Sequence, residues 1–428
     1  MKYKFIAFAC ATFWVTIKLA VADDALTLDE YFVAALKRSE VVAIQSELIR
    51  QAEERYHQAN STLLPTVNAS ASYTWQDPTP AGEFSTSISP NRQSLAKISA
   101  TQPLFRGFRE FAGLRQTKAL LGAQNEDYLN ARIQLFKDVA QNFFNILSIQ
   151  QDLQNLEEEI KQNVERESEL KDRARIGRSR SSETLSVQST IGTLRAQVEQ
   201  LRGQLQNARE AFTFLSGLTS SATLNDSESL PSSLAPLEEY LARLNLRPDI
   251  KAAQTRVNAA QENVSVARGA HWPSLDLNAN RYLARTGNLK DVTWDVQLAL
   301  TVPIYSGGLL QSKVNEALSQ RTQAELSASQ VTRQAEQEIR SLYQNIIFDQ
   351  TQLQALEKAT AAAKDNYAAQ RREYRLGLVT NLDVLQALTA FQENQRALDR
   401  ARYTAKLDYA KLQAATVERK IVLEAAGP

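Results

Sequence analysis

The chain carries long stretches with apolar residues at steps of three and four positions, the spacing of one face of a long α-helix. In the first long stretch, which has no proline between Pro103 and Gly177, the apolar positions are Val139, Phe143, Ile146, Ile149, Leu153, Leu156 and Ile160. A stripe this narrow is typical of coiled-coil helices, which bury it against neighbouring helices. We therefore predict a helix from Phe108 to Arg175, about 100 Å long at 1.5 Å per residue.

Shorter stretches alternate between apolar and polar residues, which is the pattern of β-strands with two different faces. Such alternation covers residues 67–75 and 96–100, and it returns at 275–279 and 292–302. A segment rich in Pro, Gly and Ser, residues 77–90, separates the first two, and Thr286-Gly287-Asn288 separates the last two. The sequence therefore predicts two β-hairpins, 66–102 and 274–302, each of which begins after a proline.

The helical and alternating stretches recur in the same order at a constant offset of 200 residues. Gln102-Pro103-Leu104-Phe105-Arg106-Gly107 corresponds to Val302-Pro303-Ile304-Tyr305-Ser306-Gly307, and the register still holds at Leu185 and Leu385. This indicates an internal two-fold repeat, in which each copy has a helix, a β-hairpin, a long helix, a tip and a returning helix. The expected domains are a first repeat at 23–217, a connector at 218–245, a second repeat at 246–417 and a short tail at 418–428.

The two predicted hairpins have the length and pattern of membrane-spanning strands. Strands of about ten residues can cross a bilayer at a tilt. Aromatic residues, which line membrane interfaces, fall near the hairpin ends at Tyr73, Trp75, Tyr282 and Trp294. A soluble, half-buried sheet has the same period. In lipid, however, four strands alone would leave two open edges with unsatisfied backbone groups, so a membrane barrel must be shared between subunits.

Composition excludes most other classes of protein. Residues 1–22 have the charged start, apolar centre and A-x-A end of a signal peptide, so the chain is expected to be exported and to lose its one cysteine, Cys10. A net charge of +1 indicates no nucleic-acid partner. The histidines, His57 and His271, lie far apart, and no catalytic, metal-binding or phosphate-binding motif is present. We predict that the protein is not an enzyme and needs no cofactor.

The two predicted tips carry paired glycines and paired carboxylates. Gly177 and Gly377 suit the left-handed conformation with which many helices end. Glu183 and Asp383 follow at the start of each returning helix, where the helix dipole favours a carboxylate. Capping explains these acidic residues as well as a gating role does, so both interpretations stay open.

Taken together, these motifs resemble the TolC-type outer-membrane efflux proteins over essentially all of the chain after residue 22. The resemblance rests on the motifs at 102–107 and 302–307, on Leu246-Arg247-Pro248-Asp249-Ile250, and on Tyr374-Arg375-Leu376-Gly377 leading into Asp383-Val384-Leu385. It implies an α+β membrane protein. Three copies would share a twelve-stranded β-barrel in the lipid of the outer membrane, with four strands per chain. The barrel would continue into a long α-helical coiled-coil tunnel in the periplasm, with an equatorial region formed by the connector and the tail.

The resemblance also implies partners and functional residues at the tips. In this family the tips dock to a periplasmic adaptor protein, which links the homotrimer to an inner-membrane transporter. The adaptor-docking tips would contain Gly177, Leu185, Gly377, Thr380 and Leu385, and the periplasmic gate would contain Asp383, with Glu183 and Tyr374 as a linked pair. Two positions differ from some members, because Gln386 replaces a second aspartate and Val379 replaces a linking arginine.

The resemblance thus predicts that the protein is the exit duct of a tripartite efflux pump or of a type I secretion system. Members of this family export drugs, metal ions or proteins. Two other classes stay open as alternatives. A periplasmic coiled-coil scaffold would explain the helices but not four amphipathic strands with aromatic ends. An exported enzyme would need a polar catalytic site that the motifs do not indicate.

Overall fold

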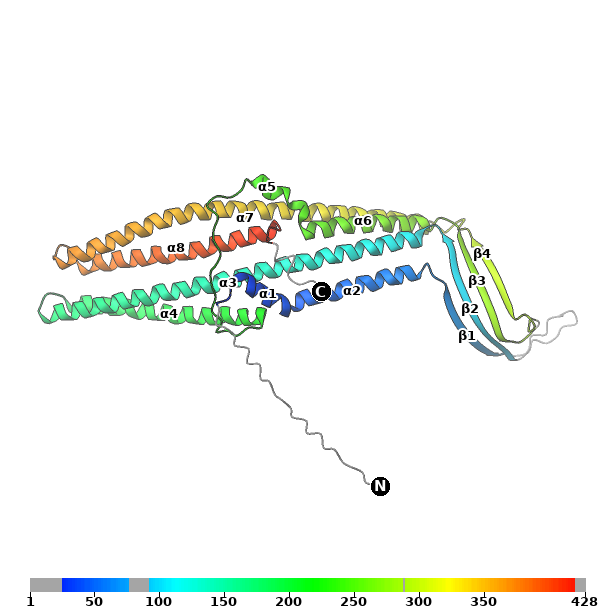
Figure 1. Cartoon of the computed structure of the whole chain (residues 1–428), viewed down its shortest axis with the longest axis horizontal. Helices are drawn as coiled ribbons and strands as arrows, with labels where there is room; N and C mark the ends of the chain where they lie inside the picture. Colours follow the sequence, from blue (N-terminus) through cyan, green and yellow to red (C-terminus); the bar gives the residue numbers. More distant parts are fainter. Residues whose placement is uncertain (1–24, 77–91, 288, 420–428) are drawn as a thin grey trace, which may run out of the picture.

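The computed structural model describes residues 25–76, 92–287 and 289–419 (Figure 1). The predicted signal peptide at 1–22 and the predicted loop at 77–90 lie outside the described residues, as do Asn288 of the predicted turn and residues 420–428 of the predicted tail. The molecule is elongated, with long helices along most of its length and a single sheet at one end.

The described helices are α1 (Leu28–Arg38), α2 (Glu40–Ser61), α3 (Arg109–Arg175), α4 (Ser181–Ser216), α5 (Leu237–Ala242), the 3-10 helix η1 (Leu244–Leu246), α6 (Pro248–Gly269), α7 (Leu309–Arg375) and α8 (Asn381–Ala415). The described strands are β1 (Thr66–Trp75), β2 (Arg92–Arg106), β3 (Ser274–Arg285) and β4 (Trp294–Thr301). This confirms the predicted combination of very long helices with four strands in one chain.

The two longest helices, α3 and α7, contain 67 residues each and run along most of the molecule (Figure 1). Helix α3 begins after two residues in the left-handed conformation, Gly107 and Phe108. Gly107 is required by packing as well as by its φ of +67°, because an added Cβ would lie 2.1 Å from the carbonyl oxygen of Gly269 in α6. This close approach lets the start of α3 pack beside the end of α6.

The sheet is antiparallel in the order β1-β2-β3-β4, so β1 and β4 form its two edges. One face is polar: Lys97 Nζ donates to Asn280 Oδ1 (3.3 Å), and the Tyr282 hydroxyl donates to Asp295 Oδ2 (2.7 Å). The opposite face carries apolar side chains that are exposed in the single chain, including Val296, Leu298 and Leu300. The alternation in the sequence therefore produces a sheet with one polar and one apolar face.

Strand β2 extends through Pro103 to Arg106, beyond the hairpin end that the sequence predicts at residue 102. The pairing of β2 with β3 shifts register between Pro103 and Phe105. An irregularity of this kind accommodates a proline, which has no N–H to donate to the neighbouring strand. Beyond it, Arg106 forms an ion pair with Asp276 of β3 (2.8 Å), so the sheet continues almost to the start of α3.

The largest hydrophobic core lies at mid-length, where α1 packs against α3 and α4. Buried aromatic side chains dominate it, namely Tyr31, Phe32, Phe136, Phe143, Phe144 and Phe212. Burying one such side chain stabilises the fold by about 1.5–3 kcal/mol. The connector contacts this core through Leu224, which packs against the core and forms a parallel β-bridge with Leu26. Arg419 adds ion pairs to Asp29 and Glu228, at 2.6 and 2.7 Å.

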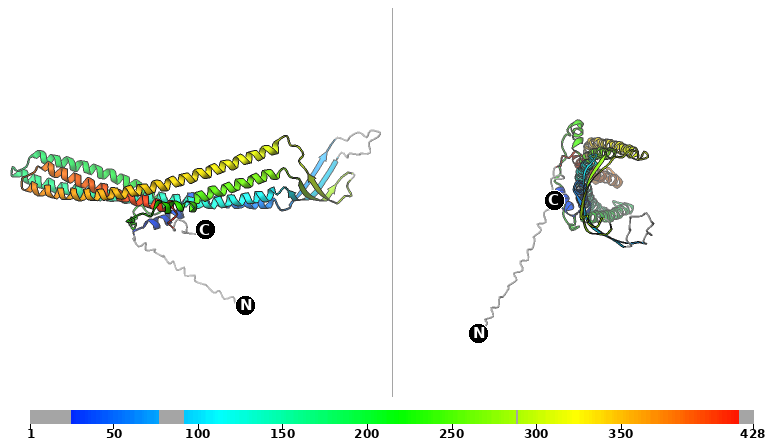
Figure 2. Two further views of the ribbon diagram at one scale, coloured as in Figure 1. Left: turned by 90° about the horizontal axis from the view of Figure 1, so that it is seen from above. Right: turned by 90° about the vertical axis from the view of Figure 1, so that its right-hand side faces the viewer.

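Viewed along its long axis, the chain follows an open arc, which the helices and the sheet share (Figure 2). The polar and apolar faces of the sheet thus lie on the two sides of a curved wall. Within the part of the chain that the structure describes, no helix combines the length and the apolar character needed to cross a membrane.

Candidate functional site at the helical tips

Both helical hairpins turn at the end of the molecule that lies farthest from the sheet (Figure 1). The α3–α4 turn contains Gly177 (φ +74°), and the α7–α8 turn contains Gly377 (φ +77°). Each glycine N–H donates to the end of the preceding helix, Gly177 to Ala174 O and Gly377 to Tyr374 O, both at 3.0 Å. A Cβ at either glycine would meet no atom within 4 Å, so the left-handed φ and not crowding favours glycine here.

A small hydrophobic cluster joins the two hairpins just behind their tips. It contains Leu170 of α3, Val187 and Ile191 of α4, Tyr374 of α7 and Val384 of α8. Val379 and Leu385 pack against it as half-buried neighbours. The structure thus brings two predicted site residues, Tyr374 at the end of α7 and Leu385 near the start of α8, against the first hairpin.

Two arginines of α3 contact the ring of Tyr374. The guanidinium carbons of Arg166 and Arg173 lie 3.8 and 4.6 Å from the centroid of the Tyr374 ring, within the range of cation–π attraction. Arg166 is buried, and its Nε donates to Asn381 Oδ1 at the start of α8 (2.9 Å). Glu169 accepts a hydrogen bond from each arginine, at 2.9 and 3.0 Å, which fixes the two guanidinium groups. We call Arg166, Arg173 and Tyr374 the arginine clamp.

Arg166, Arg173 and Asn381 are not among the site residues that the sequence predicts. The one local signal is spacing, because Arg166 follows Asp152 and Glu159 at steps of seven residues, on a stripe that a coiled coil buries. Charged residues on such a stripe point to specific partners. The partners themselves cannot be read from local pattern, since Asn381 lies 215 positions away from Arg166 along the chain.

Asp383 forms a capping box with Thr380 at the start of α8. Asp383 Oδ2 accepts from the Thr380 backbone N–H (2.8 Å) and hydroxyl (2.6 Å), while the Asp383 N–H donates to Thr380 Oγ1 (3.4 Å). The hydroxyl and backbone hydrogen bonds from Thr380 lower the pKa of Asp383. The carboxylate therefore stays ionised at neutral pH, so it caps the helix and also brings a negative charge to the tip.

The first tip is capped differently. Glu183 Oε2 accepts from the Ser179 hydroxyl (2.7 Å), and the residue at the N-cap, Arg180, makes no side-chain capping bond. The structure thus places Glu183 beside Ser179 of its own hairpin, whereas Tyr374 lies in the arginine clamp. A link between Glu183 and Tyr374 stays a prediction. Leu185 lies on the surface and is 64% exposed.

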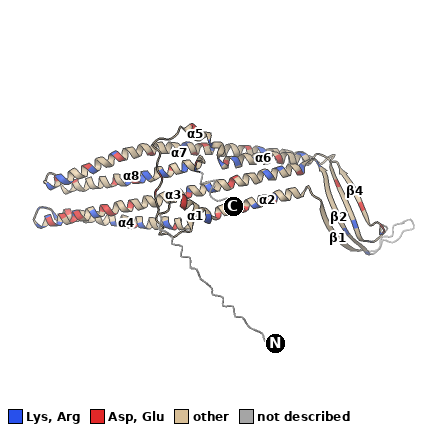
Figure 3. Cartoon of the chain, in the orientation of Figure 1, with Lys and Arg blue, Asp and Glu red and all other residues tan. Residues whose placement is uncertain are grey.

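In the segments 170–185 and 370–385, which form the two tips, exposed basic residues outnumber exposed acidic residues. Figure 3 marks the charged residues along the helices. The exposed arginines are Arg175, Arg178, Arg180, Arg371, Arg372 and Arg375. Of these, Arg175 pairs with Asp172 (3.3 Å) in an exposed contact. An exposed basic rim of this kind attracts acidic partner surfaces and anions.

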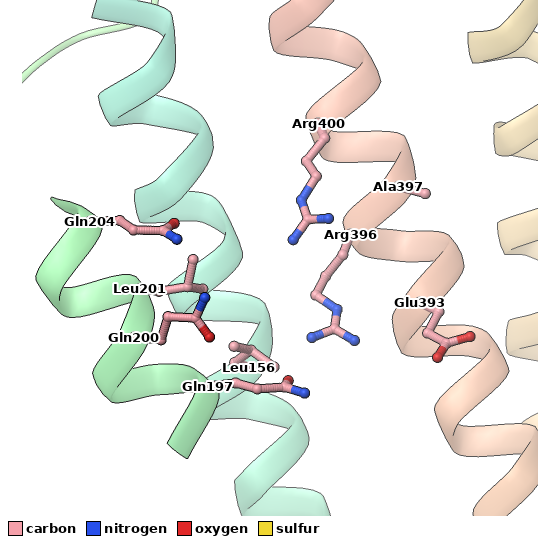
Figure 4. A pocket seen from close by; sticks show the side chains of 9 residues that line it. All are labelled: Leu156, Gln197, Gln200, Leu201, Gln204, Glu393, Arg396, Ala397 and Arg400. Carbon is pink, nitrogen blue, oxygen red and sulfur yellow. The ribbon is translucent and has the colours of Figure 1, made fainter. Parts of the chain in front are cut away.

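A polar pocket of about 480 Å³ lies between α4 and α8, away from the tips (Figure 4). Its walls are Gln197, Gln200, Gln204, Glu393, Arg396, Ala397 and Arg400, with Leu156 and Leu201 beside them. Figure 4 shows Arg396 and Arg400 reaching from α8 toward the glutamines of α4. Within the described ranges, no group of three or more His, Cys, Asp or Glu side chains is arranged to hold a metal ion.

The sequence of this chain matches a known family over most of its length. The model of the outer membrane efflux protein family matches residues 33–218 and 241–417. Outer membrane protein TolC of Escherichia coli K12 is 25% identical over 382 residues, which are 85% of this chain and 76% of TolC. The pyoverdine export outer membrane protein OpmQ of Pseudomonas aeruginosa is 27% identical over 419 residues, which are 92% of this chain and 84% of OpmQ.

The fold also matches solved structures. A crystal structure of CusC superposes with a TM-score of 0.81 at 20% identity and covers 91% of each chain. The outer membrane protein VceC of Vibrio cholerae superposes with a TM-score of 0.80 at 20% identity, over 91% of this chain and 95% of VceC. At this level of identity the superpositions establish the fold, a four-stranded sheet continuous with long helices.

Proposed function

The chain belongs to the outer membrane efflux protein family, and on this premise we propose that it forms an outer-membrane channel that serves as the exit duct of an export machine. The relatives described above are named as outer-membrane and export proteins. The Brucella suis relative BepC is named as an outer membrane efflux protein and CusC as part of a cation efflux system. We propose that this chain, like them, transports and does not catalyse a reaction.

The proposal depends above all on the sheet. It has four antiparallel strands, one polar and one apolar face, and two edges, β1 and β4, that pair with no further strand in the described part of the chain. Backbone groups left unpaired in lipid are costly. Pairing β1 of one copy with β4 of the next would remove every edge. Three copies would then form a twelve-stranded barrel, a size within the range of outer-membrane barrels.

The arrangement of the helices supports a tunnel below this barrel. Helices α3 and α7 each reach about 100 Å at 1.5 Å per residue, and they follow the same open arc as the sheet (Figure 2). Three such arcs complete a tube. We further propose that the two halves of the chain, 23–217 and 246–417, are an internal repeat, because α3 and α7 have equal lengths and begin 200 residues apart.

The proposed location follows from the same division of the molecule. The barrel would lie in the outer membrane with its apolar face toward lipid, and the helices would lie in the periplasm. The mid-length core with its connector would form an equatorial belt. Export by a signal peptide at 1–22 is part of this proposal.

We propose that the tips are the docking end of the channel. Gly177, Leu185, Gly377, Thr380 and Leu385 would meet a periplasmic adaptor protein, which links the channel to an inner-membrane transporter. The exposed Leu185 and the basic rim offer apolar and charged contacts to such a partner.

We also propose that the periplasmic gate contains Asp383, Glu183 and Tyr374. The support is positional: Asp383 brings an ionised carboxylate to the tip, and Tyr374 joins the two hairpins through the arginine clamp. Three copies of Asp383 around one axis would repel one another and attract cations.

The function is tested by reconstituting the purified protein in planar lipid bilayers. A channel should produce discrete, equal conductance steps, whereas a periplasmic coiled-coil scaffold should leave the bilayer silent. A matched control is the same protein with Leu298→Lys, which places a charge on the apolar face of the sheet and should prevent insertion. If correctly assembled wild-type protein produced no conductance steps, the result would support the function of a periplasmic scaffold.

A further inference from the structure

Two arginines lie on the face of the sheet that is otherwise apolar. Arg281 of β3 stands between Asn280 and Tyr282, whose side chains both form hydrogen bonds on the polar face, so Arg281 points to the opposite face. Arg92 of β2 lies an odd number of positions from Lys97, which also belongs to the polar face. It therefore points to the apolar face too, and both arginines are exposed.

Each of these arginines is directly opposite a tryptophan on the neighbouring strand. The register pairs Arg92 with Trp75 of β1, and Arg281 with Trp294 of β4. The two pairs are the last ones described in the two hairpins, at the end of the sheet farthest from the helices. Trp75 is 76% exposed and Trp294 is 63% exposed. Because tryptophan favours the membrane–water interface, both pairs fit the outer interface of the proposed barrel.

Purely structural roles do not account for the two arginines. Charged residues often protect the open edge of a sheet, but Arg92 and Arg281 stand on β2 and β3, which pair with a strand on both sides. The guanidinium carbon of Arg92 lies 5.4 Å from the centroid of the Trp75 ring, and such a cation–π contact leaves the N–H groups able to donate.

The two arginines also differ from other basic residues of the sheet in their partners. Among the residues that the structure describes, neither Arg92 nor Arg281 forms an ion pair with a carboxylate. At the opposite end of the sheet, in contrast, Arg106 pairs with Asp276 at 2.8 Å. The positive charge at the far end of the apolar face is thus left for a partner outside the chain.

The chemistry of each arginine–tryptophan pair fits the phosphate of a membrane lipid. A guanidinium can donate two parallel hydrogen bonds to one phosphate group. The indole ring offers an apolar surface to the rest of the lipid. An arginine that faces lipid is costly at the centre of the bilayer but tolerated near its surface, where its long side chain reaches the headgroups. A phosphate at this level would compensate for the lost hydration of the guanidinium.

The position of the tryptophans places this chemistry at the junction between copies. Trp75 and Trp294 belong to β1 and β4, the two edges of the sheet. In the proposed barrel, β1 of one copy pairs with β4 of the next, so the two tryptophans lie on adjacent strands. Arg92 and Arg281, one strand farther on each side, would flank them. This arrangement exists only in the assembled barrel.

We propose that the Arg92–Trp75 pair of one copy and the Trp294–Arg281 pair of the next copy together bind the phosphate headgroup of an anionic membrane lipid at each junction of the barrel. This inference rests on the proposed function, in which the copies share one barrel, and adds a lipid that bridges them. The occupant is a lipid because the two tryptophans contribute an apolar contact that free phosphate does not use. Lipid binding is measured without transport, so it can fail while the channel still conducts in bilayers of phosphatidylcholine.

The first test measures lipid binding by native mass spectrometry of the assembly in an uncharged detergent. Phosphatidic acid is compared with phosphatidylcholine that has the same acyl chains. The wild-type assembly should bind phosphatidic acid at least about tenfold more tightly, the factor expected from one hydrogen bond between charged groups. Equal affinity for the two lipids would overturn the proposal.

Two double variants locate the lipid on the assembly. Arg92→Gln with Arg281→Gln should lose the preference for phosphatidic acid. The matched control, Arg175→Gln with Arg375→Gln, removes the same charge from exposed positions at the tips and should keep the preference. A preference that survives in the first variant, or is lost equally in both, would contradict a site at the two arginine–tryptophan pairs.

A further comparison distinguishes a lipid from free phosphate. Inorganic phosphate, added to the wild-type assembly at the same concentration as phosphatidic acid, should leave most of the lipid bound. If it displaces the lipid completely, the site recognises phosphate alone and the lipid assignment is wrong.

The last test asks whether the lipid bridges two copies. A ligand that binds only the assembled barrel stabilises the assembly. Phosphatidic acid should therefore raise the temperature at which the assembly separates into single chains on SDS gels, phosphatidylcholine should not, and the rise should vanish in Arg92→Gln with Arg281→Gln. Tight binding of phosphatidic acid without any rise in this temperature would contradict a site at the junction.

Discussion

The guanidinium carbon of Arg166 in α3 lies 3.8 Å from the centroid of the Tyr374 ring in α7, and this contact joins the two hairpins at their tips. It is made by the face of the ring and not by the hydroxyl. The same arginine bonds Asn381 at the start of α8 (2.9 Å), so one side chain holds both helices of the second hairpin. The closed arrangement of the tips therefore depends on α3 as much as on the turn itself.

This geometry predicts that Tyr374→Phe and Tyr374→Leu differ. Phenylalanine keeps the ring that Arg166 and Arg173 cover, so the channel should conduct almost like the parent. Leucine loses a cation–π contact worth about 0.5–2 kcal/mol and should give a leakier channel in planar bilayers. If the hydroxyl link to Glu183 controls closure instead, Tyr374→Phe will leak as much as Tyr374→Leu.

Two substitutions of Asp383 distinguish a capping role of this residue from a gating role. Asp383→Asn keeps an oxygen that accepts from Thr380 but removes the charge, whereas Asp383→Ala loses both. We expect both variants to conduct more and to select cations less, and only the alanine variant to lose about 1 kcal/mol of stability. Single-channel recordings and thermal unfolding measure the two effects. If Asp383→Asn conducts and selects ions like the parent protein, Asp383 has only a structural role.

The two faces of the sheet predict different tolerance to charge at neighbouring positions. Val296→Lys puts a charge on the apolar face, at a cost of about 2–4 kcal/mol near the middle of a bilayer. Gln297→Lys, one residue away, points to the polar face and should assemble normally. The yield of heat-modifiable assembly in membranes measures the difference. Equal yields would mean that the apolar face does not meet lipid.

The raised pKa of Asp349 in α7 predicts that the stability of the protein depends on pH in a specific way. Burial and the neighbouring Asp408 of α8 raise its pKa from 3.8 to about 6. Between these two pH values the folded protein binds more protons than the unfolded chain, so stability falls as pH rises through about 6. Asp349→Asn should raise the unfolding temperature at pH 7 and have little effect at pH 4. Asp365→Asn, at an exposed position on the same helix, is the control.

Local pattern predicts much of this fold because its elements are long and regular. The apolar steps of three and four residues on α3, the alternation at 292–302 and the glycines at both tips each have a local physical cause. Strand β2 passes Pro103 because a shift in its pairing with β3 accommodates the proline, and this depends on a partner strand far along the chain. The arginine clamp was not predicted for the same reason, since it joins residues of α3 to a residue of α7 far along the chain.

The number of chains in one channel tests the shared barrel most directly, and native mass spectrometry of the detergent-purified assembly measures it. Four strands with two open edges predict a single species with three times the mass of the processed chain, and no folded monomer that retains the sheet. A species of one or two chains that still forms channels in planar bilayers would contradict the shared barrel.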